Sequence, residues 1–149
     1  MENTQKPDNI QSSKMIARLA DMALEARKQA YTPYSNYTVG AALLTADNKI
    51  YSGCNIENAS YGATNCAERT AFFKAVSEGE RDFKAIAISG GIRGQEPTDY
   101  AYPCGICRQV MKEFCGDDFQ IIVVKSSADY QVFTLAELLP YGFGGESIK

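Results

Sequence analysis

Two short cysteine motifs place the strongest constraint on how this chain can fold. A C-x-E motif occupies residues 66–68, and a P-C-x-x-C motif occupies residues 103–107. Each motif lies at the predicted start of a helix, where free backbone N–H groups and the positive end of the helix dipole favour a thiolate over a thiol. The fold must therefore bring two helix N-termini together if the sulfurs are to share one metal ion. The chain has no histidine, so such a site would use sulfur alone.

Cys66, Cys104 and Cys107 are the predicted ligands of one Zn²⁺ ion. Three sulfur ligands leave the fourth position of a tetrahedral zinc site open, which is the mark of a catalytic rather than a structural site. Cys115 lies about 12 Å of helix beyond Cys107, and Cys54 precedes a loop rich in asparagine, so we expect both to be core thiols. A thioredoxin-like redox pair is the alternative for C-x-x-C, but it would leave the first motif unexplained.

Glu68 lies two residues after Cys66, in the first helical turn, from which it can point beside the open metal position. A carboxylate there can take a proton from an activated water and deliver it to a substrate. The alternative is half of a capping box with Asn65. Because three thiolates blunt the acidity of zinc-coordinated water, Arg69 and Arg108 are expected to donate hydrogen bonds to sulfur and withdraw charge. A solvent-exposed charge is the alternative for each arginine.

The composition indicates a single domain that acts on a small molecule. A chain of 149 residues fits one domain, predicted over residues 13–149 after a disordered polar extension over residues 1–12. The net charge of −3 and the absence of a basic run argue against a nucleic-acid polymer as partner. No apolar stretch is long enough to span a membrane, and no signal peptide is evident. The odd number of cysteines favours free thiols in a reducing compartment, so we expect a cytoplasmic protein.

Apolar periodicity predicts the order helix, β-hairpin, helix, strand, helix, strand, strand, helix. Helices are expected over residues 14–30, 66–77 and 103–116, with Asn65 capping the second, and a capping box opens a short helix at residue 134. Strands are expected over residues 37–44, 50–54, 84–89, 119–125 and 130–133. This order favours an α/β protein, a three-layer α/β/α sandwich around a mixed sheet of about five strands.

With these motifs in place, the chain closely resembles the small homotetrameric zinc-dependent cytidine deaminases of the cytidine/deoxycytidylate deaminase superfamily, whose zinc signature it carries. The resemblance extends from residues 31–35 (YTPYS) to 138–140 (LLP), through 39–43 (VGAAL), 53–59 (GCNIENA), 66–71 (CAERTA) and 103–110 (PCGICRQV). It implies a cytidine deaminase-like fold, one Zn²⁺ per chain and a nucleoside substrate. The implied reaction is hydrolytic deamination of cytidine and 2′-deoxycytidine in pyrimidine salvage, in which zinc-activated hydroxide attacks C4 and Glu68 shuttles protons.

The same resemblance implies the substrate contacts. Asn55 and Glu57 would bind the ribose 3′-hydroxyl, in a segment that distinguishes nucleoside deaminases from relatives that share only the zinc motifs. Ala67 would contribute backbone contacts to the pyrimidine. The position of Tyr37 is often phenylalanine in the family and packs against the base, so the hydroxyl here is a departure.

Two further residues are implied to act across subunit borders. Tyr61 and Phe143 would reach the active site from neighbouring subunits of a homotetramer. The loop over residues 92–102 is longer than is usual in the family. Three alternatives remain at this point: a relative acting on another aminopyrimidine such as blasticidin S, a polynucleotide cytosine deaminase, which would need a basic aromatic groove, and a non-catalytic zinc-stabilised module.

Overall fold

The computed structural model describes residues 12–149 and confirms the predicted order of elements. The helices are α1 (Ser13–Ala26), α2 (Ala67–Ser77), α3 (Gly105–Phe114) and α4 (Leu135–Leu138). The strands are β1 (Tyr37–Thr45), β2 (Ile50–Cys54), β3 (Phe83–Ile92), β4 (Gln120–Ser126) and β5 (Asp129–Thr134). Short 3-10 helices are η1 (Arg27–Gln29), η2 (Tyr61–Ala63) and η3 (Gly145–Ser147). The predicted N-terminal extension lies outside the described residues except for Ser12, whose hydroxyl caps α1 by accepting from Met15 N.

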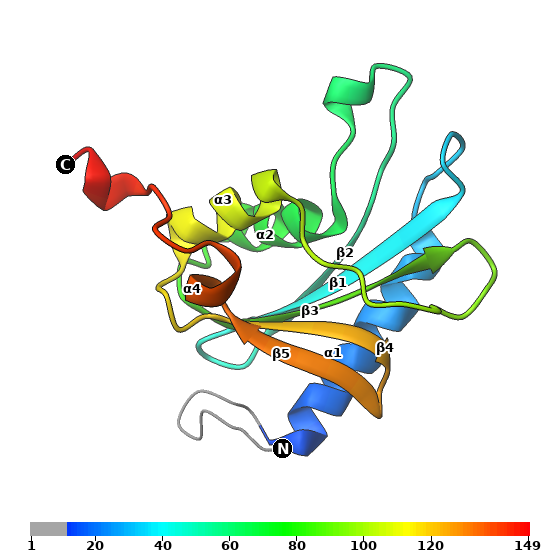
Figure 1. Ribbon diagram of the computed structural model, residues 1–149, viewed down its shortest axis with the longest axis horizontal. Helices are drawn as coiled ribbons and strands as arrows, with labels where there is room; N and C mark the ends of the chain where they lie inside the picture. The colour runs from blue at the N-terminus through cyan, green and yellow to red at the C-terminus, as the bar shows by residue number, and fades with distance from the viewer. Residues whose placement is uncertain (1–11) are drawn as a thin grey trace.

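The described strands form one mixed sheet in the order β2-β1-β3-β4-β5 (Figure 1). β1 runs antiparallel to both β2 and β3, and β5 runs antiparallel to β4. β3 and β4 are parallel, so the chain must cross over between them, and the crossover contains α3. This position of α3 places the second cysteine motif beside the sheet.

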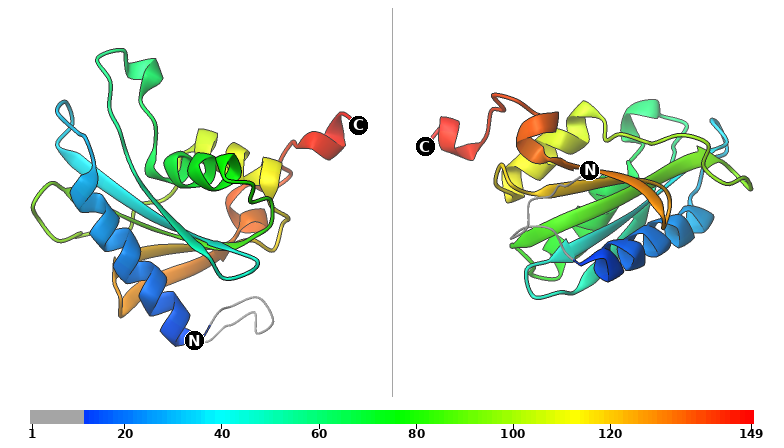
Figure 2. Two further views of the ribbon diagram at one scale, coloured as in Figure 1. Left: turned by 180° about the vertical axis from the view of Figure 1, so that it is seen from behind. Right: turned by 60° about the horizontal axis from the view of Figure 1, so that its bottom comes forward.

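Helices cover both faces of the sheet, so that α1 lies on one face and the pair α2 and α3 on the other (Figure 2). Successive side chains of a strand point to opposite faces. In β1, Ala41 and Leu43 pack towards α2 and α3, whereas Ala42 and Leu44 pack towards α1. Because both faces are covered, the strand is apolar throughout this run. The predicted three-layer α/β/α architecture is confirmed.

Two elements end in places that the sequence pattern did not predict. α1 ends at Ala26 and continues only as the 3-10 helix η1, because the chain then turns so that Tyr31 pairs with Ile56. β3 continues to Ile92, beyond the expected end at residue 89, since its two glycines stay paired with β1. Both changes lie near the start of β1.

The helix caps agree only in part with expectation. The capping box of α4 is formed between Thr134 and Glu137. At α2, however, the N-cap is Cys66 and not Asn65. The Asn65 side chain instead donates to Thr70 Oγ1 at 3.2 Å, which draws it away from the free backbone N–H groups of the first turn.

Because Gly40 has no side chain, the backbones of α1 and β1 can lie in direct contact. A Cβ atom at this position would lie 2.0 Å from Ala23 O and 2.7 Å from Arg27 N. We expect Gly40→Ala to lower the free energy of unfolding by about 2 kcal/mol, because two backbones must separate. Urea denaturation would measure this loss.

Gly62→Ala is the matched control, because an added Cβ there would meet nothing within 4 Å. It should change the free energy of unfolding by less than ~0.5 kcal/mol. Equal stability of the Gly40→Ala protein and its parent would contradict the close packing of α1 on β1.

Candidate active site

The N-termini of α2 and α3 meet over the sheet and bring three sulfurs together. The Sγ atoms of Cys66, Cys104 and Cys107 lie within 4.8 Å of one another. The Sγ atoms of Cys66 and Cys104 are 3.8 Å apart, which is close to the edge of a sulfur tetrahedron with zinc–sulfur bonds of about 2.3 Å. Cys54 and Cys115 are not part of this cluster. The donor set and its spacing therefore fit one Zn²⁺ with a fourth position left open.

Helix geometry explains how the ligands converge. Cys66 and Cys104 are the N-cap residues of α2 and α3, and Cys107 lies in the first turn of α3. The Cys107 N–H donates to Cys104 Sγ at 3.4 Å. The hydrogen bond from the Cys107 side chain, aided by one from Arg69, lowers the pKa of Cys66 to about 5. The same bond and burial raise the pKa of Cys107, so without a bound metal ion Cys66 is the more acidic of these two thiols.

The two arginines that follow the motifs act differently. Arg69 Nη2 donates to Cys66 Sγ at 3.2 Å. Arg108 donates instead to the carbonyl oxygens of Pro103 at 2.8 Å and Leu138 at 2.7 Å. The expectation that Arg108 donates to sulfur is therefore corrected: its guanidinium group joins the end of α4 to the residue before Cys104.

The hydrogen bond from Arg69 should matter for turnover more than for metal retention. It withdraws charge from Cys66, and outer residues of this kind typically contribute about 10- to 100-fold to affinity or activity. We expect Arg69→Gln to keep zinc and to lower kcat about tenfold, as measured by steady-state kinetics with metal analysis. Arg18→Gln, at an exposed position of α1, should match the parent. Full turnover by Arg69→Gln would contradict this role.

Glu68 is the buried carboxyl of the site. It is only 4% exposed, and this burial raises its pKa to about 7, with the negative charge of Cys66 acting in the same direction. Its side chain also faces Cys107. The capping-box alternative fails because Asn65 is not the N-cap of α2. A carboxyl whose pKa is near neutral can both take up and release protons at working pH.

Asn55 lies where β2 ends and bonds to the start of β1. Its Oδ1 accepts from Val39 N at 2.9 Å, and its Nδ2 donates to Tyr37 O at 3.0 Å. A side-chain amide has two donors and two acceptor sites. These bonds fix the orientation of Asn55 and leave one N–H and one lone pair for a ligand.

The Glu57 carboxylate is held by the turn at residues 34–35, which lies in the YTPYS segment. Its Oε1 accepts from Tyr34 N at 2.9 Å and from Ser35 N at 3.1 Å, and its Oε2 accepts from the Ser35 hydroxyl. These residues, with Tyr61 among others, line an open cavity of about 370 Å³. The signal for this turn was the YTPYS segment, but its partner was not evident because the two segments are more than 20 residues apart.

The other residues predicted to contact the substrate differ in how exposed they are and where they lie. Ala67 is fully buried in the first turn of α2. Tyr61 is 76% exposed and Phe143 is 59% exposed. Figure 1 shows that the loop carrying η2 and the C-terminal segment both project from the body of the molecule. Tyr37 is exposed, and its hydroxyl lies over Gly90 on the face of the sheet that carries α2 and α3.

A three-sulfur metal site with an open position and an adjacent proton-carrying carboxyl is the arrangement of a zinc-dependent base deaminase. Residues 13–123 match the family model described as the cytidine and deoxycytidylate deaminase zinc-binding region. The matched region contains both cysteine motifs. The chain belongs to this family, and the zinc predicted from the cysteine motifs is confirmed.

Relatives and solved structures agree with this assignment. The chain is 48% identical over 134 residues to the cytidine deaminase of Sporosarcina psychrophila, with 90% of this chain and 95% of the relative covered. It is 51% identical over 127 residues to that of Halalkalibacterium halodurans, with 85% and 92% covered. The crystal structure of cytidine deaminase from Burkholderia pseudomallei superposes with a TM-score of 0.77 at 46% identity, covering 85% of this chain and 97% of that one.

Proposed function

We propose that this protein catalyses the hydrolytic deamination of cytidine and 2′-deoxycytidine to uridine and 2′-deoxyuridine, with release of ammonia, in pyrimidine salvage. The observation that carries the proposal is a buried carboxyl, Glu68, beside a cluster of three sulfurs to which the described residues add no fourth ligand. The similar proteins named above are cytidine deaminases that are covered over nearly their whole length. That coverage supports the same activity here.

In the proposed mechanism, Glu68 moves the protons. Zn²⁺, when bound by the three cysteines, supplies the Lewis acidity that makes water nucleophilic near neutral pH. Glu68 takes a proton from that water as the oxygen adds to C4 of the base, and places the proton on N3. The second water proton goes to the C4 amine, which leaves as ammonia while the oxygen stays on the ring. Arg69 draws charge from Cys66 throughout.

Asn55 and Glu57 would bind the sugar of the nucleoside. The free N–H of Asn55 can donate to the 3′-hydroxyl, and Glu57 can accept from it. Tyr37 would pack against the base, and the backbone at Ala67 would contact the pyrimidine. A site built to hydrogen-bond a hydroxyl strongly disfavours analogues that lack it, because its polar groups would stay unpaired.

We further propose a homotetramer with active sites at the subunit borders. Its support is the exposure of Tyr61 and Phe143 on projecting segments, because large exposed apolar groups often mark association surfaces. In that assembly both side chains would cover the substrate of a neighbouring subunit. Analytical ultracentrifugation tests this: a fully active monomer would contradict shared sites.

The cellular setting follows from the thiols. All five cysteines are unpaired, which suits a reducing compartment, and we propose the cytoplasm. Among residues 12–149, no helix is both long and apolar enough to cross a membrane.

A substrate panel distinguishes this function from its rivals. Purified protein would be assayed with cytidine, 2′-deoxycytidine, blasticidin S and a cytosine-containing oligonucleotide, with ammonia release as a common readout. We expect turnover of the two nucleosides and none of the oligonucleotide. Turnover restricted to blasticidin S would shift the function to another aminopyrimidine. Bound zinc without turnover of any of them would favour a non-catalytic module.

A further inference from the structure

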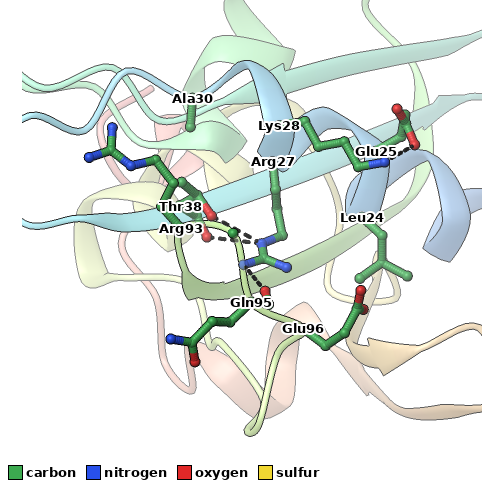
Figure 3. Close-up of a pocket in the computed structure, with 10 residues that line it drawn as sticks. Leu24, Glu25, Arg27, Lys28, Ala30, Thr38, Arg93, Gln95 and Glu96 are labelled. Carbon is green, nitrogen blue, oxygen red and sulfur yellow. Dashed lines mark hydrogen bonds and ion pairs between the residues drawn. The ribbon is translucent and has the colours of Figure 1, made fainter.

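Arg27 is a buried charge on the side of the sheet away from the sulfur cluster. It lies in η1, directly after α1, and is only 7% exposed. Its side chain lines a cavity of about 270 Å³. Figure 3 shows its guanidinium group beside Thr38 and Gln95. In the described part of the chain, no carboxylate lies within ion-pair distance of it. A buried charge must be satisfied by other polar groups.

Backbone carbonyl oxygens, together with one hydroxyl, accept hydrogen bonds from the Arg27 guanidinium group. Arg27 Nε donates to Thr38 O at 3.3 Å and to Thr38 Oγ1 at 3.2 Å. Its Nη2 donates to Ile92 O at 3.2 Å and to Gln95 O at 3.0 Å. One guanidinium group therefore joins the end of α1 to β1, β3 and the first part of the long loop over residues 92–102. This contact gives that loop a structural anchor.

The bonds fall where the sheet would otherwise fray. Tyr37 is the first residue of β1, and its register partner Ile92 is the last residue of β3. Terminal residues of an element open more easily than its centre. The Thr38 hydroxyl adds a bond to Gly91 O at 3.1 Å. Arg27 thus closes the open end of the β1–β3 ladder from the α1 face.

The same end of β1 carries the proposed sugar-binding amide. Asn55 is held by Tyr37 O and Val39 N, the two positions that flank Thr38. A displacement of Thr38 would therefore move both groups that orient Asn55. The ring of Tyr37 extends from the same backbone.

We propose that Arg27 is a positioning residue for nucleoside binding, which holds the start of β1 so that Asn55 meets the sugar of the substrate. The inference rests on the proposed function. Arg27 lies on the α1 face, opposite the sulfur cluster, and acts through the backbone. It should therefore affect substrate binding and leave zinc binding and the chemical step largely intact.

The test compares Arg27→Met and Arg27→Lys on cytidine and on 3′-deoxycytidine. We expect one zinc per chain, a KM for cytidine raised about tenfold by Arg27→Met and about threefold by Arg27→Lys, and kcat within about threefold of the parent. The KM for 3′-deoxycytidine should rise by less than about threefold, because the hydroxyl that Asn55 would bind is already missing.

Arg81→Met is the matched control, since Arg81 also donates to two carbonyls but is exposed and lies in the segment between α2 and β3. It should match the parent with both substrates. If Arg27→Met does not fold, Thr38→Val tests the same role, because it removes one hydrogen-bond acceptor of Arg27. We then expect a smaller rise in the KM for cytidine than with Arg27→Met, and no rise in the KM for 3′-deoxycytidine.

Equal losses with the two substrates, or a loss confined to kcat, would overturn the role of Arg27. So would an unchanged KM for cytidine in a variant that has lost the guanidinium group. A parent protein that does not deaminate cytidine would overturn the proposed function and this inference with it. An active parent with equal losses would overturn the inference alone.

Discussion

Glu68→Gln should retain one zinc per chain and lose nearly all turnover. Glutamine keeps the size of the side chain, so the cluster should form as in the parent. It cannot accept a proton from water or deliver one to N3, and general acid–base groups contribute about 10²- to 10⁴-fold to rate. We expect kcat for cytidine to fall at least ~10³-fold, measured by the loss of ultraviolet absorbance on deamination, with metal content measured on the same sample.

Glu78→Gln is the control for the Glu68 substitution, because Glu78 is exposed at the C-terminal end of the same helix. It should be as active as the parent. Near-normal turnover by Glu68→Gln would remove the proton shuttle from the mechanism. Loss of zinc from Glu68→Gln would instead make the carboxylate part of the metal site, and would contradict the assignment of three sulfur ligands.

Cys104→Ser should lose both zinc and activity. A hydroxyl is a much poorer zinc ligand than a thiolate, and the remaining two sulfurs cannot hold the ion in a defined geometry. Cys104 is exposed, so the substitution itself should cost the core little. We expect zinc affinity to fall at least ~100-fold and turnover to fall with the zinc content. Competition with a chromophoric chelator would measure the affinity.

Cys54→Ser provides the comparison, since Cys54 is a partly buried thiol outside the cluster. It should keep stoichiometric zinc and full turnover. The melting temperature of Cys104→Ser should equal that of the parent after zinc removal, because the metal is what the substitution takes away. Stoichiometric zinc in Cys104→Ser would show that the three sulfurs are not the ligand set.

Local pattern was sufficient to predict the layers and the metal site. The apolar run of β1 and the spacing of Cys104 and Cys107 are properties of a few adjacent residues. The starts of α2 and α3 were therefore placed within two residues of where the structure has them. The meeting of Cys66 with Cys104 is a long-range contact, and it was predictable only because the chemistry of zinc requires both motifs.

The polar contacts that position the site were not predictable in this way. Arg27 bonds to residues 11 to 68 positions away, and Arg108 bonds to Leu138, which is 30 positions away. Such partners depend on how the elements pack, and a lone arginine in the sequence carries no sign of them. The expected sulfur bond of Arg108 was wrong for this reason, since position next to a motif does not determine side-chain direction.

The most direct test of the proposed function is a cytidine-to-uridine assay on purified protein whose zinc content has been measured. We expect steady conversion of cytidine with about one zinc per chain, loss of conversion when the zinc is removed, and recovery when zinc is restored. Zinc bound in stoichiometric amount with no conversion of cytidine would contradict it.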